Sequence, residues 1–201
     1  MLITLTGPSG SGKNTIQDAL FKEEQVIVSD TTRPKRPNEY DGLDYNFIDT
    51  ATFDANIAMH KYVEHVSFDG HQYGLNRDVI DQTLKCNPIA ETIVNSEGVR
   101  NLINSEYKDQ LYPIILLTSK EKVKMNLRNR QDDHEKIKER LRLHEKEMQA
   151  IHNLIVKLKH LGIDYQTIVT DSFNQEELIQ VAQETINRIK KHVHHGKIQQ
   201  L

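Results

Sequence analysis

A lysine and three glycines near the start of the chain have the types and the spacing to hold phosphate groups. They belong to the segment Gly7, Pro8, Ser9, Gly10, Ser11, Gly12, Lys13, Asn14 and Thr15. The glycines let backbone N–H groups turn inward around phosphate oxygens, and the lysine can reach the terminal phosphates of a nucleotide. The pattern G-x-x-x-x-G-K-[ST] is met except at Asn14, where Ser or Thr usually holds Mg²⁺. The segment therefore predicts a nucleotide phosphate loop.

A second group of residues is suited to hold another phosphate. Arg33 and Arg36 are separated by a short proline-containing link, and two guanidinium groups can grip a phosphate as a fork. Tyr45 and Tyr73 can each donate a phenolic O–H to the same anion. A solvated basic turn is the alternative interpretation. The segment directly follows a predicted strand, and this position favours a binding site.

The elements that must position these residues alternate between strands and helices. Apolar runs predict strands at residues 2–6, 26–29, 89–95, 112–118 and 165–170. Helices are predicted at 15–22, within 47–61, and at 76–85, 120–130, 134–160 and 175–190. A hairpin is predicted at 62–73 with its turn at Asp69-Gly70, and 30–46 is expected to be a loop or a loosely built insert.

This alternation predicts an α/β fold with a doubly wound parallel sheet. In such sheets, ligands bind beyond the carboxyl ends of the strands. The phosphate loop, Ser29 and Asn95 would all lie at that edge.

Composition excludes several classes of protein. The chain has 201 residues and a formal net charge of −3, which suits one domain with no general attraction to nucleic acid or lipid. Its one cysteine, Cys86, excludes an intrachain disulfide and fits a reducing compartment. The absence of a long apolar run, with the first strand at the N-terminus, predicts a cytoplasmic protein. The histidines are scattered apart from a group in the tail and predict no metal site.

The sequence resembles the guanylate kinase family. The matching segments are 7–13, 29–36, 41–47, 62–64, 72–74, 95–99, 127–130, 140–141 and 164–171. The likeness runs from residue 1 to about residue 190, and 30–47 is its most specific part. It implies a P-loop NTPase fold in a single domain at 1–190, with a C-terminal tail at 191–201. The implied parts are a core at 1–30, 76–120 and 145–190, an acceptor-binding insert at 31–75 and a helical lid at about 121–144.

The resemblance also implies roles for individual residues. ATP, with Mg²⁺, would lie on residues 7–15. The acceptor phosphate would be held by Arg33, Arg36, Tyr45 and Tyr73. The guanine edge would be read by Glu64 and Ser29, with Asn95 near the base. Charge on the transferring phosphoryl group would be stabilised by Lys13, Arg36, Arg130 and Arg140.

Fewer residues of this sequence match the family's pattern at the positions that contact the base and the metal. Asn95 and Ile93 stand where the family has Asp, Leu75 where it has Ser or Thr, and Thr170 where it has Asn. A lost base hydrogen bond costs roughly 1–3 kcal/mol. We therefore expect an ATP-dependent kinase for GMP or a related nucleotide that reads guanine less strictly, working as a monomer or a homodimer. The alternatives are a kinase for another phosphorylated acceptor, such as a sugar phosphate, and a non-catalytic module that binds phosphopeptides. The retained Lys13 favours catalysis.

Overall fold

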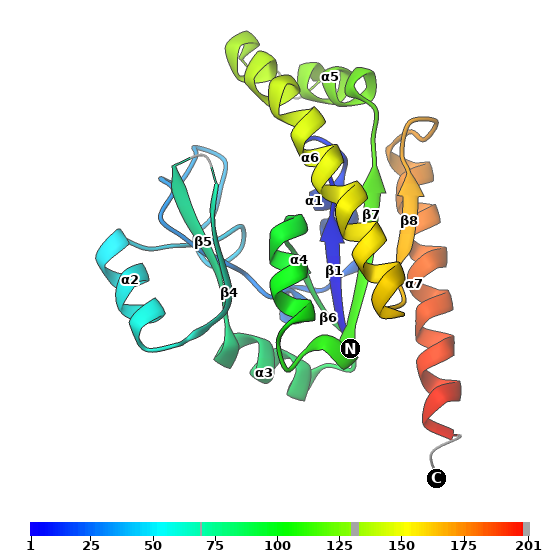
Figure 1. Ribbon diagram of the computed structural model, residues 1–201. Helices are drawn as coiled ribbons and strands as arrows, with labels where there is room; N and C mark the ends of the chain where they lie inside the picture. The colour runs from blue at the N-terminus through cyan, green and yellow to red at the C-terminus, as the bar shows by residue number, and fades with distance from the viewer. Residues whose placement is uncertain (69, 130–132, 199–201) are drawn as a thin grey trace.

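The computed structural model describes residues 1–68, 70–129 and 133–198. Its centre is a parallel sheet in the order β6-β1-β7-β8 (Figure 1). These strands are β1 (Leu2–Thr6), β6 (Ala90–Ile93), β7 (Leu111–Leu117) and β8 (Gln166–Val169). Every residue of β1 is buried, as expected for a central strand covered on both faces. The structure confirms the predicted α/β fold with a parallel sheet.

Helices cover both faces of this sheet, because the side chains of β1 alternate between two apolar clusters. On one face, Ile3 and Leu5 pack against α1 (Lys13–Leu20) and α7 (Gln175–Ile198). On the other face, Leu2 packs with residues of α4 (Ser96–Ile103) and α6 (His134–Leu161). The sheet is therefore wound on both sides, with the loop between β1 and α1 at its carboxyl edge.

A second sheet, which we call the insert sheet, lies beside the core in the order β3-β2-β5-β4. Its strands are β2 (Asp30–Thr31), β3 (Asn46–Phe47), β4 (Tyr62–Phe68) and β5 (His71–Asn76). Helix α2 (Thr50–Ala58) packs on one face, where Phe53 stacks on the ring of Tyr62 at 4.6 Å between centroids. The Tyr62 hydroxyl donates to Asp30 at 2.7 Å. Helix α3 (Arg77–Cys86) leads back to the core.

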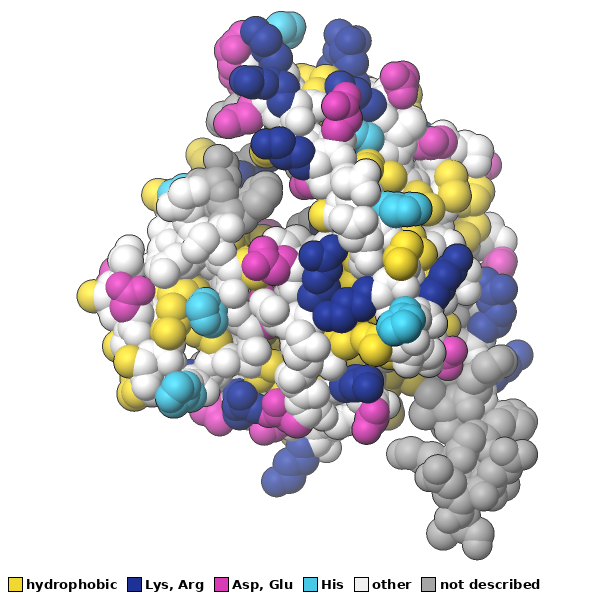
Figure 2. All heavy atoms as spheres, in the orientation of Figure 1, with side chains coloured by type: hydrophobic (Ala, Val, Ile, Leu, Met, Phe, Trp, Pro, Cys, Tyr) yellow, Lys and Arg dark blue, Asp and Glu magenta, His cyan; other side chains and the backbone are white. Residues whose placement is uncertain are grey.

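A pair of helices rises above the carboxyl edge of the central sheet. Helix α5 (Lys120–Asn129) packs against the first turns of α6, where Val123, Leu127 and Ile137 form a small apolar cluster. In Figure 2 the surface is hollowed between the insert sheet and this helix pair. Two short 3₁₀ helices, η1 (Glu23–Gln25) and η2 (Lys108–Gln110), complete the described elements.

The structure differs from the predicted elements in four places. Residues 26–29 form no strand; only Val26 bridges to Glu91 at the edge of the sheet. Residues 30–46, expected to be a loop or a loosely built insert, contribute β2 and the start of β3, because β2 pairs with β5 and β3 pairs with β2. Helix α4 was missed, and α7 continues to Ile198 rather than ending at residue 190. Within the described residues, no helix is long and apolar enough to cross a membrane.

Candidate active site

The phosphate loop joins β1 to α1, and its shape depends on glycine at particular positions. Gly12 has a φ of +99°, in the left-handed region that side chains disfavour. A Cβ there would also lie 2.6 Å from Leu178 Cδ2. A Cβ on Gly7 would lie 2.7 Å from Ser11 Oγ. The loop therefore closes tightly enough to turn its backbone N–H groups toward an anion.

Lys13 lies over this loop. Its Nζ donates to the carbonyl oxygens of Gly7 at 2.7 Å and Pro8 at 3.0 Å. The hydroxyl oxygen of Ser11 is buried without a hydrogen-bond partner among the described residues. A cation beside an unpartnered hydroxyl and the backbone N–H groups of the loop suits the phosphates of ATP. The residues present therefore fit this ligand.

The loop offers few ligands for a metal ion. Asn14 is exposed and Thr15 is half-buried at the start of α1. The described residues contain no cluster of three or more His, Cys, Asp or Glu side chains that could hold a metal. Mg²⁺ is commonly held through substrate phosphates and water with few protein ligands. The site fits Mg²⁺ bound in that way, with the Asn14 amide oxygen or the Thr15 hydroxyl as the local protein ligands.

The structure brings three of the predicted acceptor-site residues together on the insert sheet. The rings of Tyr45 and Tyr73 meet edge to face at 5.7 Å between centroids. The guanidinium of Arg33 lies 5.3 Å from the centroid of the Tyr45 ring and also contacts Tyr73. Burial raises the pKa of the Tyr45 phenol, with Tyr73 adding to the rise and Arg33 opposing it. Tyr45 therefore keeps its proton at neutral pH and remains a donor.

Glu39, which sequence reasoning missed, organises this group. Arg33 Nη2 donates to Glu39 Oε1 at 2.7 Å, and the backbone N–H of Arg36 donates to Glu39 Oε2 at 2.9 Å. Burial alone would raise the pKa of Glu39, but these hydrogen bonds hold it below its usual value. The Arg36 side chain is 56% exposed, with its Nη1 3.7 Å from Glu39 Oε1. Glu39 thus fixes Arg33 in place and leaves Arg36 able to move toward a ligand.

Glu64 lies on the same face of the insert sheet. Tyr73 lies opposite Val66 and Leu75 opposite Glu64, two cross-strand pairs separated by one, and every second residue of a strand shares a face. Glu64 is only 4% exposed, and its Oε2 has no hydrogen-bond partner among the described residues. A buried acceptor without a donor is costly unless a ligand supplies one.

The surroundings of Glu64 raise the pKa of its carboxyl. Burial raises its pKa to about 8, the nearby Glu97 carboxylate adds to the rise, and a hydrogen bond with Asn101 opposes it. Leu75 is fully buried in the main core cluster and offers no polar group. Gly98 allows the close approach of α4, because a Cβ there would lie 3.2 Å from Glu64 Oε2. Glu97, Gly98 and Asn101 were not predicted as site residues.

Asn95 and Ser29, which were also predicted near the base, make hydrogen bonds within the protein. Asn95 is the N-cap of α4, and its side-chain oxygen accepts from the backbone N–H groups of Glu97 and Gly98 at 3.0 and 2.9 Å. Its carbonyl oxygen is therefore committed to the helix. Ser29 directly precedes β2, and its backbone oxygen accepts from Asn46 at 3.0 Å. Of Glu64, Ser29 and Asn95, the Glu64 carboxyl is the one with an unpartnered buried side-chain oxygen among the described residues.

Helix α6 brings the lid to the phosphate loop. The backbone N–H of Ser9 donates to Glu147 Oε2 at 3.4 Å, and His144 Nε2 lies 2.8 Å from the Thr118 oxygen. Arg140 precedes these residues by one and two turns on the same face of α6. It is half-buried there. Arg130, the other predicted lid arginine, lies outside the described residues.

A phosphate loop after the first strand of a parallel α/β sheet, together with an inserted sheet that gathers Arg33, Tyr45 and Tyr73, is typical of a P-loop phosphotransferase. The family model described as guanylate kinase matches residues 1–176. The chain belongs to the guanylate kinase family, as its sequence motifs predicted, and it is a guanylate kinase-type phosphotransferase.

Individual relatives agree with this assignment. The guanylate kinase of Coxiella burnetii is 31% identical over 206 residues, which cover 100% of this chain and 94% of that protein. The guanylate kinase of Homo sapiens is 29% identical over 94% of this chain and 95% of its own length. A guanylate kinase crystal structure from Anaplasma phagocytophilum matches with a TM-score of 0.65 at 20% identity, covering 98% of this chain and 85% of that one, and supports the fold.

Proposed function

We propose that this enzyme transfers the γ-phosphoryl group of ATP to GMP and has relaxed specificity for the guanine base, although its phosphate-binding residues are all present. The observation that carries the proposal is the buried Glu64 carboxyl, whose Oε2 has no partner and whose neighbour across the strands is apolar. Guanine offers the adjacent donors N1–H and N2–H₂. An ionised Glu64 accepts both, and a neutral one does not.

The phosphate groups are held by charge and alignment rather than by covalent chemistry. On the donor side, Lys13 leaves the carbonyls of its own loop to contact the terminal phosphates of ATP. On the acceptor side, Arg33, fixed by Glu39, and the phenols of Tyr45 and Tyr73 hold the monophosphate. Arg36 and Arg140 approach the transferring group as the lid closes and excludes water. Mg²⁺, when bound, neutralises charge on the phosphate oxygens.

The relaxed base specificity follows from the ionisation of Glu64. A neutral carboxyl presents one donor and one acceptor, which matches hypoxanthine through N1–H and O6. At neutral pH most Glu64 is neutral in the free site, because its pKa is about 8. Guanine has the same pair of groups, so the protonated form binds GMP and IMP alike, and only the ionised form gains the additional hydrogen bond from N2–H₂ of guanine. Leu75 supplies no hydrogen bond that would restore the preference for guanine.

A coupled ADP-release assay with ATP and Mg²⁺ tests this function against GMP, dGMP, IMP, AMP, CMP and UMP. Turnover with GMP and measurable turnover with IMP are expected, and both should be lost in Lys13→Ala. Turnover with GMP alone would refute the relaxed specificity. ATP binding without turnover of any nucleotide would refute the proposed activity and favour a sugar phosphate or phosphopeptide at the Arg33 site. The cytoplasmic location, the domain boundaries and the oligomeric state stay predictions.

A further inference from the structure

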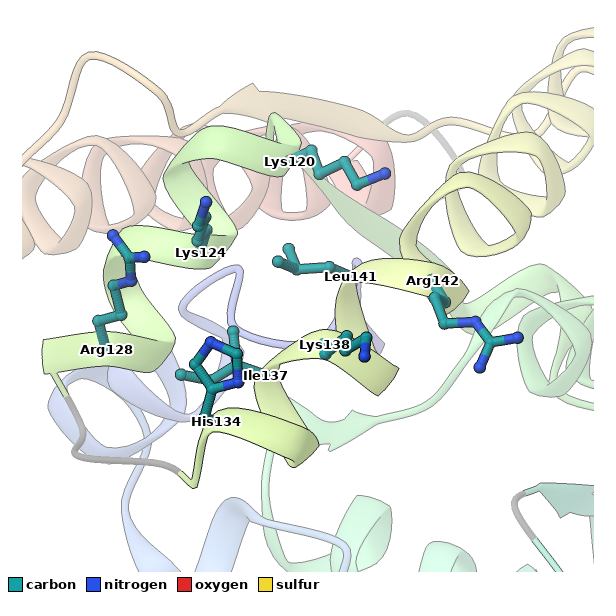
Figure 3. A pocket seen from close by; sticks show the side chains of 8 residues that line it. All are labelled: Lys120, Lys124, Arg128, His134, Ile137, Lys138, Leu141 and Arg142. Carbon is teal, nitrogen blue, oxygen red and sulfur yellow. The ribbon is translucent and has the colours of Figure 1, made fainter.

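A basic cleft lies between α5 and α6, outside the residues assigned to the two nucleotide sites. Its cavity has a volume of about 320 Å³, which is within the range of small-ligand pockets. Figure 3 shows two rows of basic side chains lining it, with Ile137 and Leu141 on the floor between them. The rows are Lys120, Lys124 and Arg128 on α5, and His134, Lys138 and Arg142 on α6.

The spacing within each row makes the arrangement costly for the free protein. Members of a row are four residues apart, so their side chains are neighbours on one helix face. Like charges at this spacing destabilise a helix, and here two such rows border the same cavity, with their charged ends pointing in several directions (Figure 3). An arrangement of this kind is stabilised by a multivalent anion bound between the rows.

The cleft faces away from the phosphate loop. On α6, the face that meets the loop carries Glu147, which accepts from Ser9. Arg140 lies two turns before Glu147 on that face. Arg140 lies two residues from Lys138 and two from Arg142, which places it on the opposite side of the helix. On α5, Asn126 donates to the Gly10 oxygen at 2.9 Å, and it likewise lies two residues from both Lys124 and Arg128. The cleft is therefore distinct from the ATP site.

Most of its cations have no carboxylate partner. Among the described residues, Lys124, Arg128, Lys138 and Arg142 form no ion pair, whereas Lys120 Nζ lies 3.0 Å from Glu145 at one end of the cleft. Acidic side chains flank the rows, and Glu135 and Glu139 lie beside Lys138. These acids limit the positive region to the cleft and disfavour a long nucleic acid strand. Figure 2 shows the same mixture of basic and acidic groups over this end of the molecule.

We propose that the cleft between α5 and α6 is a second anion site, which binds a short polyphosphate chain between its two basic rows. The phosphates contact Lys124, Arg128, Lys138 and Arg142. The apolar floor of Ile137 and Leu141 offers a surface for a nucleoside carried by the same ligand. A ligand held there bridges the two helices of the lid.

Isothermal titration calorimetry of the full chain with inorganic tripolyphosphate tests the site. Two classes of binding are expected, one at the phosphate loop and one at the cleft. Lys13→Ala should weaken the first, and the double variant Lys124→Gln with Lys138→Gln should weaken the second at least tenfold. The matched control is Lys108→Gln with Lys159→Gln, which removes the same charge from exposed positions outside the cleft and should leave both classes intact.

A second titration of the Lys13→Ala protein with ATP identifies the source of the phosphates. Affinity for ATP equal to that for tripolyphosphate would support a site for the phosphate chain alone, and tighter binding of ATP would support contact of the base with the apolar floor. The double variant should keep the kcat of the wild type, which separates this site from the active site. One class of binding in the wild type, equal weakening in the control, or an adventitious ion only, bound at high millimolar concentration, would overturn the proposal.

Discussion

The phosphate loop and the insert sheet both hold phosphates, but they are built in different ways. The loop relies on backbone geometry, with Gly12 in a left-handed conformation and Lys13 resting on the loop's own carbonyls. The insert sheet relies on side chains brought from separate strands, with Arg33 fixed by Glu39 and set against Tyr45. The loop is therefore a local structure, and the acceptor site is a tertiary one. The two regions should respond differently to substitution.

The largest effect is expected at the loop. Lys13→Ala should lower kcat by about 10²–10³, the cost of removing one preorganised charge-stabilising group. The KM for GMP should change little, because Lys13 contacts the donor phosphates. Steady-state kinetics of the ADP-release reaction measure both values. A large rise in the GMP KM with unchanged kcat would show that Lys13 belongs to the acceptor site instead.

A smaller effect, of a different kind, is expected at the insert sheet. Arg33→Ala should raise the KM for GMP by about 10- to 100-fold, since a hydrogen bond to a charged group contributes about 1.5–3 kcal/mol. Glu39→Gln keeps the size of the side chain but removes its charge, and should raise the same KM only several-fold. The comparison of the two variants separates binding from positioning. Equal effects would mean that Glu39 contributes as much as Arg33.

The KM for GMP should depend on pH through Glu64, which lies at the base-binding end of the insert sheet. Glu64 has a pKa of about 8, so the KM for GMP should fall up to tenfold per unit as pH rises from about 6.5 to 8. Glu97→Gln removes a neighbouring negative charge, lowers the pKa of Glu64 and moves this dependence to lower pH. Profiles of KM and kcat for both proteins provide the measurement. An unchanged profile in Glu97→Gln would show that burial alone sets the ionisation of Glu64.

The smallest effect concerns stability of the core beneath the loop. Glu91 is fully buried, with Oε2 accepting from Gln17 at 2.6 Å and Oε1 without a partner among the described residues. Burial raises its pKa to about 8. The unfolded chain releases this proton near the ordinary value of 4.5, so stability falls as pH rises from about 4.5 to 8. Glu91→Gln should raise the melting temperature at pH 8.5 and leave it unchanged at pH 4. A lower melting temperature at pH 8.5 would contradict this.

The difference between the two regions also explains how much the sequence could predict. The loop and the strand before it are consecutive residues, so their spacing alone indicates both structure and ligand. The insert sheet is harder, because β2 and β3 are two-residue strands that form only by pairing with other segments. Glu39 could have been suspected from its place six residues after Arg33. The interactions of Glu64 with Glu97 and Asn101 depend on α4, an eight-residue helix that was not predicted from the sequence.

The most direct test of the account is the ratio of kcat/KM for GMP to that for IMP, measured at pH 6.5 and at pH 8.5. Ionisation of Glu64 should raise the ratio at least tenfold between these values, with IMP favoured more at the lower pH. The ratio should become nearly independent of pH in Glu64→Gln. A high ratio that does not change with pH in the wild-type enzyme would show that Glu64 is already ionised in the free site and would contradict the account.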